Sequence, residues 1–432
     1  MPPRGATGGA HPLLPVFALL GGASALVIGT AWLLSVPQVL PGFLGSPSAV
    51  ALTHVFTLLF VSLVYLGTLQ QLPAVLLVTD LAWRGSGWFS LPVFAGGATL
   101  LVWGLASGFR PTPLAVGGSA VVAALGMAAA QVIATALRSP PKDPASRGLV
   151  AAVCYLFLTV ALGLLLAAAR TSAGVATAVG YPAALHQTTG IVGAFMLGIA
   201  TSGHKLLSMF ALSKGGAVWR LRVATYLTHG VMAASVLAAV APVFGGSPAL
   251  SRVAGQLAVL LVAVVAALQF FEVGALLRRR LRKRLEAPVE RYVLAHAFLP
   301  FAGLMYAVGW RSAAVVALLL GFVGLAVSGM LIKILSFLTW TRAFGSTRTA
   351  GAPPPLLRDL TRPWLEPVIT AGLCLGALAA TMAVATGSLL TARLAASALL
   401  VGAVAQLAQA ATIVGRTLAR RVGPATAVVT TK

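Results

Sequence analysis

Long apolar segments alternate with short polar loops along the whole chain, and this pattern predicts its structure. Each segment has about 20 residues or more, the length that an α-helix needs to cross the hydrocarbon core of a bilayer. Because backbone exposed to lipid must satisfy its own hydrogen bonds, we expect each segment to be a helix. The pattern predicts twelve transmembrane helices, at 13–34, 51–77, 88–107, 113–137, 149–169, 183–210, 222–244, 253–277, 292–310, 313–340, 365–386 and 390–415.

The predicted loops are short, so we expect one transmembrane domain over residues 1–432 and no separate soluble domain. The loop 278–291 is the most basic. We expect it to continue the eighth helix out of the membrane.

The ends of the second, sixth and tenth predicted helices are similar to one another. Lys205-Leu206-Leu207-Ser208 ends the sixth helix and Lys333-Ile334-Leu335-Ser336 ends the tenth, with a fainter counterpart at Gln71-Leu72-Pro73-Ala74 in the second. A recurrence in every fourth helix predicts an internal repeat of four helices. The expected units are 13–137, 149–277 and 292–415, forming three arcs around pseudo-threefold pores.

The composition agrees with a membrane protein. Charged residues make up 9% of the chain and apolar residues 59%, and the mean hydropathy is +0.97. A soluble protein carries about a quarter charged residues.

The net charge of +23 raises the question of nucleic-acid binding, which the distribution of the charge excludes. With the N-terminus in the cytoplasm, 23 of the 30 basic residues lie on inner loops and tails. This is the positive-inside rule. It predicts a multi-pass protein of the bacterial inner (plasma) membrane, with both termini cytoplasmic and the anionic inner leaflet as partner.

Ionisable residues inside apolar helices are costly and are therefore candidates for function. His54 and His186 lie about 5 Å below the predicted outer boundary, at a rise of about 1.5 Å per residue. At a shared depth they would suit the two axial positions of a haem. Small residues on the sixth helix would make room for the macrocycle: Thr188, Thr189, Gly190, Gly193 and Ala194. Alternatively, both are interfacial histidines bonded to a neighbouring hydroxyl or carbonyl.

A second polar group is expected toward the inner half of the membrane. Glu272 is the acid that we place well inside a helix, and it needs a partner such as Lys333, Lys205 or a histidine. The group fits a proton or ion path or a quinone-type pocket, whereas the lysines could instead extend to the interface. Its members are His204, Lys205, His229, Glu272, His296 and Lys333.

In topology and in three short motifs, the chain resembles the haem–copper oxidase subunit I superfamily, and most closely a bacterial offshoot of it. The motifs are a histidine that leads the second helix, His204 to Phe210 at the end of the sixth, and Lys333 to Trp340 at the end of the tenth. The resemblance implies twelve helices in three arcs of four. It also implies haem near the outer face, with one axial ligand where His54 stands.

The chain departs from that family where oxygen chemistry would occur. An oxidase has two axial histidines on the outer half of the tenth helix, whereas the segment from Ser312 to Leu318 has none. A copper centre also needs an adjacent histidine pair on the seventh helix, which carries only His229. We therefore expect no terminal oxidase activity.

Three functions remain open. The first is a haem-binding or redox-associated membrane protein that uses His54 and His186. The second is a transporter or haem- or metal-handling permease, with Glu272 and His296 carrying the coupling ion; this class usually shows paired, broken helices. The third is a non-catalytic assembly protein. No phosphate-binding loop, hydrolase triad or zinc-protease motif occurs in the sequence.

Overall fold

The computed structural model describes residues 8–11, 13–42, 44–139, 143–179, 183–213, 217–243, 245–344 and 355–422. These residues form helices, connecting loops and one isolated bridge between Ser213 and Arg280. The chain is thus a multi-pass all-α membrane protein.

Eleven helices of the described chain are long and apolar enough to span a membrane. They are α1 (Leu13–Ser35), α2–η2–α3 (Pro47–His54, Val55–Ser62, Leu63–Leu69), α5 (Gly87–Ala106), α6 (Pro111–Arg138), α7 (Pro144–Thr171), α9–η3–α10 (Ala183–Thr188, Thr189–Met196, Leu197–Phe210), α11 (Val218–Val240), α12 (Pro248–Arg278), α15–η4–α16 (Arg311–Val316, Ala317–Gly324, Leu325–Phe344), α17 (Leu365–Thr386) and α18 (Leu389–Val422). Shorter elements are η1 (Pro37–Val39), α4 (Leu72–Leu77), α8 (Ala173–Val179) and η5 (Leu357–Leu360).

Local sequence explains where several spans begin. Proline occupies the first helical position of four of them, where its missing N–H costs no hydrogen bond: Pro47, Pro111, Pro144 and Pro248. The side chains of Ser46, Asp143 and Ser247 accept hydrogen bonds from the first turns of three of these helices. Such caps satisfy backbone donors that no helical carbonyl can reach.

The predicted span at 292–310 is split into α13 (Ala287–Ala295) and α14 (Phe298–Ala307). Pro300 explains the break, because it cannot donate to the carbonyl of His296 four residues earlier. α13 packs along α16, and α14 packs along α15 and η4. Together, α13 and α14 pack along the continuous helix 311–344.

The prediction that the basic loop 278–291 extends the eighth helix is wrong. α12 ends at Arg278, and the chain folds back so that the backbone N–H of Leu281 donates to the carbonyl of Leu212. A new helix then begins at Ala287, with Pro288 in its first turn. Pro288 has no N–H to donate to the carbonyl of Arg284 four residues earlier, and its ring clashes with that carbonyl, which opposes a continuous helix through this point.

The second, sixth and tenth predicted helices share a feature that the sequence did not reveal. Each contains an eight-residue π-helical segment: η2, η3 and η4. The three similar terminal segments stand in the same register to these, sixteen positions on, from Val55 to Gln71, Thr189 to Lys205 and Ala317 to Lys333. π-helical turns in long helices are uncommon and frequently mark functional sites.

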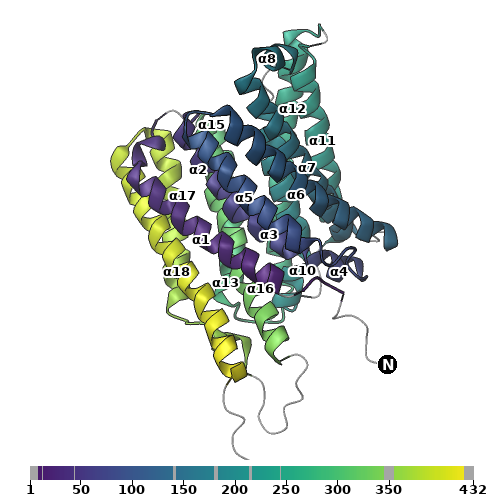
Figure 1. Cartoon of the computed structure of the whole chain (residues 1–432), viewed down its shortest axis with the longest axis vertical. Coiled ribbons are helices and arrows are strands. Elements are labelled where there is room, and N and C mark those ends of the chain that lie inside the picture. Colours follow the sequence, from purple (N-terminus) through teal and green to yellow (C-terminus); the bar gives the residue numbers. More distant parts are fainter. Residues whose placement is uncertain are drawn as a thin grey trace, which may run out of the picture.

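The three helices with π segments contact one another. η3 contacts η4 directly. Gly198 of α10 faces the Tyr65 hydroxyl, and Gly324 of η4 faces the ring of Phe56. In Figure 1, α2, α8 and α15 lie at the upper end, which is the predicted outer end, and α16 and α18 finish at the lower end.

Candidate functional site

A cavity of about 690 Å³ occupies the predicted outer half of the bundle. Its walls come from α1, α2, η2, α5, α6, α7, η3 and η4, and they are mostly leucine, valine, alanine and phenylalanine. Ligand sites are typically apolar cavities of about 300–1,000 Å³ with a few convergent polar groups. This cavity has that size and character.

His54 and His186 both line this cavity and lie beside each other. Their ring centroids are 6.2 Å apart and their planes are inclined by 13°. His54 is the residue immediately before η2, and His186 lies three residues before η3. The structure therefore brings together the two residues that the sequence indicated as ligands.

One nitrogen of each ring is held by a backbone carbonyl. Nδ1 of His54 lies 2.7 Å from the carbonyl oxygen of Val50, and Nδ1 of His186 lies 2.9 Å from that of Thr159. A carbonyl only accepts, so each Nδ1 carries the proton and each Nε2 keeps its lone pair. This is the usual arrangement for a metal-binding histidine, in which the second nitrogen fixes the ring.

The space around the pair agrees only in part with the prediction from small residues. Gly190 lines the cavity, but Thr188, Thr189, Gly193 and Ala194 do not. Gly193 instead packs against the ring of Tyr155, because a Cβ there would lie 2.8 Å from that ring. On α7, Gly163 leaves room for His186, since a Cβ at Gly163 would lie 3.1 Å from its Cε1.

The centroid separation of the pair, 6.2 Å, is close to that of two imidazoles bound to one metal ion. Two metal–nitrogen bonds of about 2 Å, with about 1 Å from each nitrogen to its ring centre, place axial ring centroids about 6 Å apart. Among the described residues, no group of three His, Cys, Asp or Glu is placed to hold a metal. Two histidines suffice for a metal porphyrin, because the macrocycle supplies the other four nitrogens.

Arg170 is the charged residue among those that line the cavity in the described chain. Its guanidinium lies 4.7 Å from the centroid of the Phe109 ring. It gives a mostly apolar cavity a positive group at the end of α7, near the predicted outer surface.

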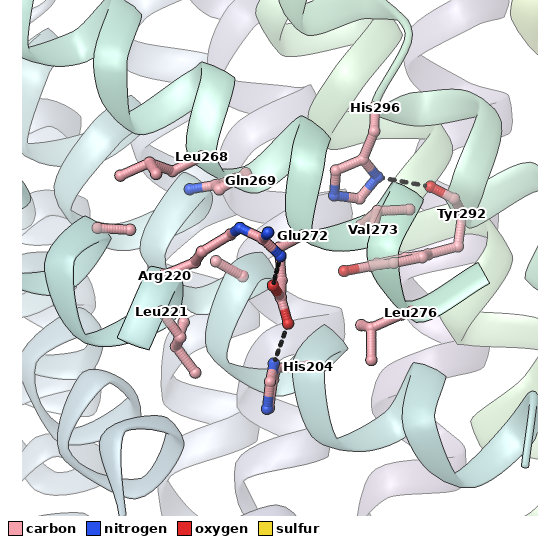
Figure 2. Close-up of a pocket in the computed structure, with 12 residues that line it drawn as sticks. His204, Arg220, Leu221, Leu268, Gln269, Glu272, Val273, Leu276, Tyr292 and His296 are labelled. Atoms are coloured by element: carbon pink, nitrogen blue, oxygen red, sulfur yellow. Dashed lines mark hydrogen bonds and ion pairs between the residues drawn. The ribbon is translucent and has the colours of Figure 1, made fainter. Parts of the chain in front are cut away.

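The predicted inner half holds a second, much smaller pocket, with a volume of about 20 Å³, which is room for one water molecule. Figure 2 shows the carboxylate of Glu272 between the side chains of Arg220 and His204. Its oxygens lie 3.1 Å from Nη1 of Arg220 and 3.2 Å from Nδ1 of His204. The partner of Glu272 is thus a histidine, as one of our alternatives had it, together with Arg220, which the sequence analysis had placed in a loop.

His296 lies on the same pocket. Its Nδ1 lies 3.0 Å from the carbonyl oxygen of Tyr292, and its other ring nitrogen points into the pocket (Figure 2). The amide oxygen of Gln269 is buried there without a protein partner.

The six residues predicted as one inner cluster lie at four separate places. Glu272, His204 and His296 share the small pocket, whereas Lys333 forms an ion pair with Glu286, and His229 is bonded to Tyr155 on another face. Lys205 is exposed, which agrees with the predicted extension to the interface. Lys333 is buried, so that alternative is wrong for it. The helical spacing alone could not assign these side chains to different faces of the bundle.

A buried ion pair between α13 and α17 was not predicted. Arg291, fully buried, donates from Nη2 to a carboxylate oxygen of Glu366 at 2.6 Å and from Nη1 to the Ser328 hydroxyl at 3.2 Å. Gln409 donates to the other oxygen of Glu366 at 2.7 Å. Arg291 falls in the predicted loop 278–291. Pro288 is a residue that commonly occupies the first turn of a helix, and it is the sequence signal that Arg291 lies in a helix.

Two carboxylates outside the spans have lowered pKa values. Burial raises the pKa of Glu286, but hydrogen bonds and charge from Lys333 and Arg282 lower it by more. Burial likewise raises the pKa of Asp143, and its hydrogen bonds to Ser146 and Ala145 at the start of α7 outweigh that effect. Both acids are therefore charged partners that hold helix ends in place.

No model of a known protein family and no curated protein matches this sequence. The case for a function therefore rests on the cavity and the residues that line it.

Proposed function

We propose that this protein is a membrane-embedded haem protein of electron transfer, with His54 and His186 as the two axial ligands. The observation that carries the proposal is the near-parallel pair of imidazoles, 6.2 Å apart in a cavity of about 690 Å³. A haem with two histidine ligands exchanges single electrons at its iron.

In this proposal, each part of the site has a separate task. The carbonyls of Val50 and Thr159 orient the two rings and keep Nε2 available as ligand. The apolar walls exclude water from the macrocycle, and burial of this kind is one of the means by which proteins tune haem. Arg170 supplies a positive group for acidic substituents at the outer edge.

The proposed protein does not reduce oxygen. Two histidines would fill both axial positions of the iron and leave none for oxygen. On the tenth helix, where the oxidase family has its axial histidines, the cavity is lined by Ser312, Val315 and Val316. The chain therefore has the ligands for electron transfer and lacks those for an oxygen-reducing centre.

We propose further that the bundle has twelve spans in three arcs of four, like subunit I of the oxidases. In support, the π segments η2, η3 and η4 recur in every fourth span, and the similar helix ends follow them in one register. To the eleven continuous spans this count adds α13 with α14, which together form the ninth span in chain order and are broken at Pro300. The concentration of basic residues on one set of loops supports a cytoplasmic location of both termini at the inner membrane.

The experiment is an absorbance spectrum of protein purified from haem-supplied cells, beside His54→Ala and His186→Ala. We expect a six-coordinate b-type haem spectrum in the wild type, and its loss in both variants because each removes one axial bond. His11→Ala is the matched control, since His11 lies outside the cavity and its variant keeps the spectrum.

A wild-type protein that stays colourless and does not bind added haem would overturn the proposal. Loss of haem in only one of the two variants would leave a single-histidine site and contradict the paired ligands.

A further inference from the structure

A hydrogen-bonded pair of polar side chains lies on the lipid-facing surface, away from both pockets. Tyr155 of α7 and His229 of α11 are joined by a hydrogen bond of 2.6 Å between Oη and Nδ1. His229 is exposed and Tyr155 half-buried. Both stand near the middle of their helices, and therefore near the centre of the bilayer.

Exposure of this pair to lipid tails would be costly. Hydrocarbon neither donates nor accepts hydrogen bonds, and ionisable residues in spans almost always face protein or a water-filled cavity. The one hydrogen bond between Tyr155 and His229 leaves a further donor and a further acceptor of the two side chains without a partner in this bond. The position therefore requires a partner that offers hydrogen bonds at the same depth.

The pair is self-complementary in either tautomer of His229. If Tyr155 donates to Nδ1, then Nε2–H remains as donor and the Tyr155 oxygen as acceptor. If Nδ1–H donates instead, the Tyr155 hydroxyl remains as donor and Nε2 as acceptor. In both cases one donor and one acceptor are presented side by side, so an identical pair turned by 180° satisfies both.

We propose that this face is the interface with a second copy of the chain, related by a two-fold axis along the membrane normal. Such an axis keeps every residue at its own depth, so the pair meets its own copy. A two-fold contact uses the same patch on both subunits, which self-complementarity requires. A different partner chain would need a matching donor and acceptor that nothing in this surface specifies.

The surrounding surface agrees with burial in a dimer. Only 28% of the central window of α7, 33% of that of α11 and 28% of that of α12 are buried, against 39% or more in the other eight spans. Beside the pair, Tyr226 is 61% exposed. Ala233, one turn after His229 on α11, is exposed, and such a small residue allows a second helix to approach closely.

The first test is cross-linking in native membranes, in a background with Cys154→Ser and Cys374→Ser. Tyr226→Cys, one turn from His229, is expected to give a covalent dimer with a lipid-permeable bismaleimide. Val401→Cys is the matched control, because Val401 is exposed near the middle of α18, remote from this face, and gives monomer. Equal cross-linking at the two positions, or capture of a different protein at Tyr226→Cys, would overturn the proposal.

The second test measures dimerisation of fluorescently labelled protein in liposomes. Tyr155→Phe and His229→Leu are each expected to weaken the dimer by about tenfold, which is the range of interhelical hydrogen bonds in membranes. Tyr155→Phe keeps the ring that packs against Gly193, so its folding and its cofactor spectrum stay as in the wild type. A wild-type protein that is monomeric at every protein-to-lipid ratio, or an unchanged dimer in both variants, would contradict the interface.

Discussion

The polar side chains of the two halves of the bundle differ in whether they face open space or one another. In the predicted outer half, two histidines face a large cavity, and one ring nitrogen of each bonds to a backbone carbonyl. In the predicted inner half, Glu272 fills a pocket of about 20 Å³ with Arg220 and His204. Ring nitrogens with lone pairs beside a large cavity indicate a ligand site, whereas a carboxylate paired with Arg220 beside a pocket the size of one water molecule holds helices together. We therefore propose a ligand-binding role for the outer half and expect the polar groups of the inner half to contribute to stability.

The largest expected effect concerns the buried ion pair of the inner half. Glu366→Leu leaves Arg291 charged and fully buried, and we expect the free energy of unfolding to fall by about 3–5 kcal/mol. The double variant Arg291→Met with Glu366→Leu should lose less, because no uncompensated charge remains. Thermal unfolding of the purified proteins measures both. A double variant that is less stable than Glu366→Leu would contradict an uncompensated buried charge as the cause of the loss.

A smaller effect separates the two pockets directly. Glu272→Gln removes the charge that Arg220 and His204 share, so we expect a loss of about 2–3 kcal/mol in the free energy of unfolding. His54→Ala removes one hydrogen bond to a backbone carbonyl, and we expect a loss of about 1 kcal/mol in the protein without haem. If His54→Ala destabilises the haem-free protein more than Glu272→Gln does, the division between the halves is wrong.

The smallest effect is a dependence of stability on pH. Because Lys333 and Arg282 lower the pKa of Glu286, this acid stabilises the folded state at pH values above its ordinary pKa of about 4.3. That contribution is lost as the pH falls through the lowered value. It amounts to about 1 kcal/mol or less, since Glu286 is partly exposed. Unfolding midpoints between pH 7 and pH 3.5 should therefore fall more steeply for the wild type than for Glu286→Gln.

Much of the fold could be predicted because membrane spans follow from local composition. The predicted ends of the span 365–386 coincide with α17, and those of the sixth span coincide with Ala183–Phe210. The prediction failed where a contact decides the backbone, as in the loop after Arg278, which pairs with the end of α10. It also missed the break at Pro300, because hydropathy does not distinguish one helix from two.

The candidate site could be predicted in its residues and not in its geometry. His54 and His186 stood out as histidines at a similar depth of apolar helices, and the structure places their rings side by side. The same reasoning grouped His229 and Lys333 with Glu272, although they lie on other faces. Depth follows from position along one helix, but the face depends on how neighbouring helices pack.

The sequence by itself determined that the chain spans the membrane many times, with rare polar residues at given depths, because hydropathy acts on each segment separately. Only the tertiary structure decided which of these residues meet. A stack of π-helical segments, the closeness of α7 to the sixth span at Gly163 and Gly190, and the break at Pro300 set those meetings. Each depends on contacts between helices far apart in the chain, where the fit of side chains, and not their average polarity, determines the free energy.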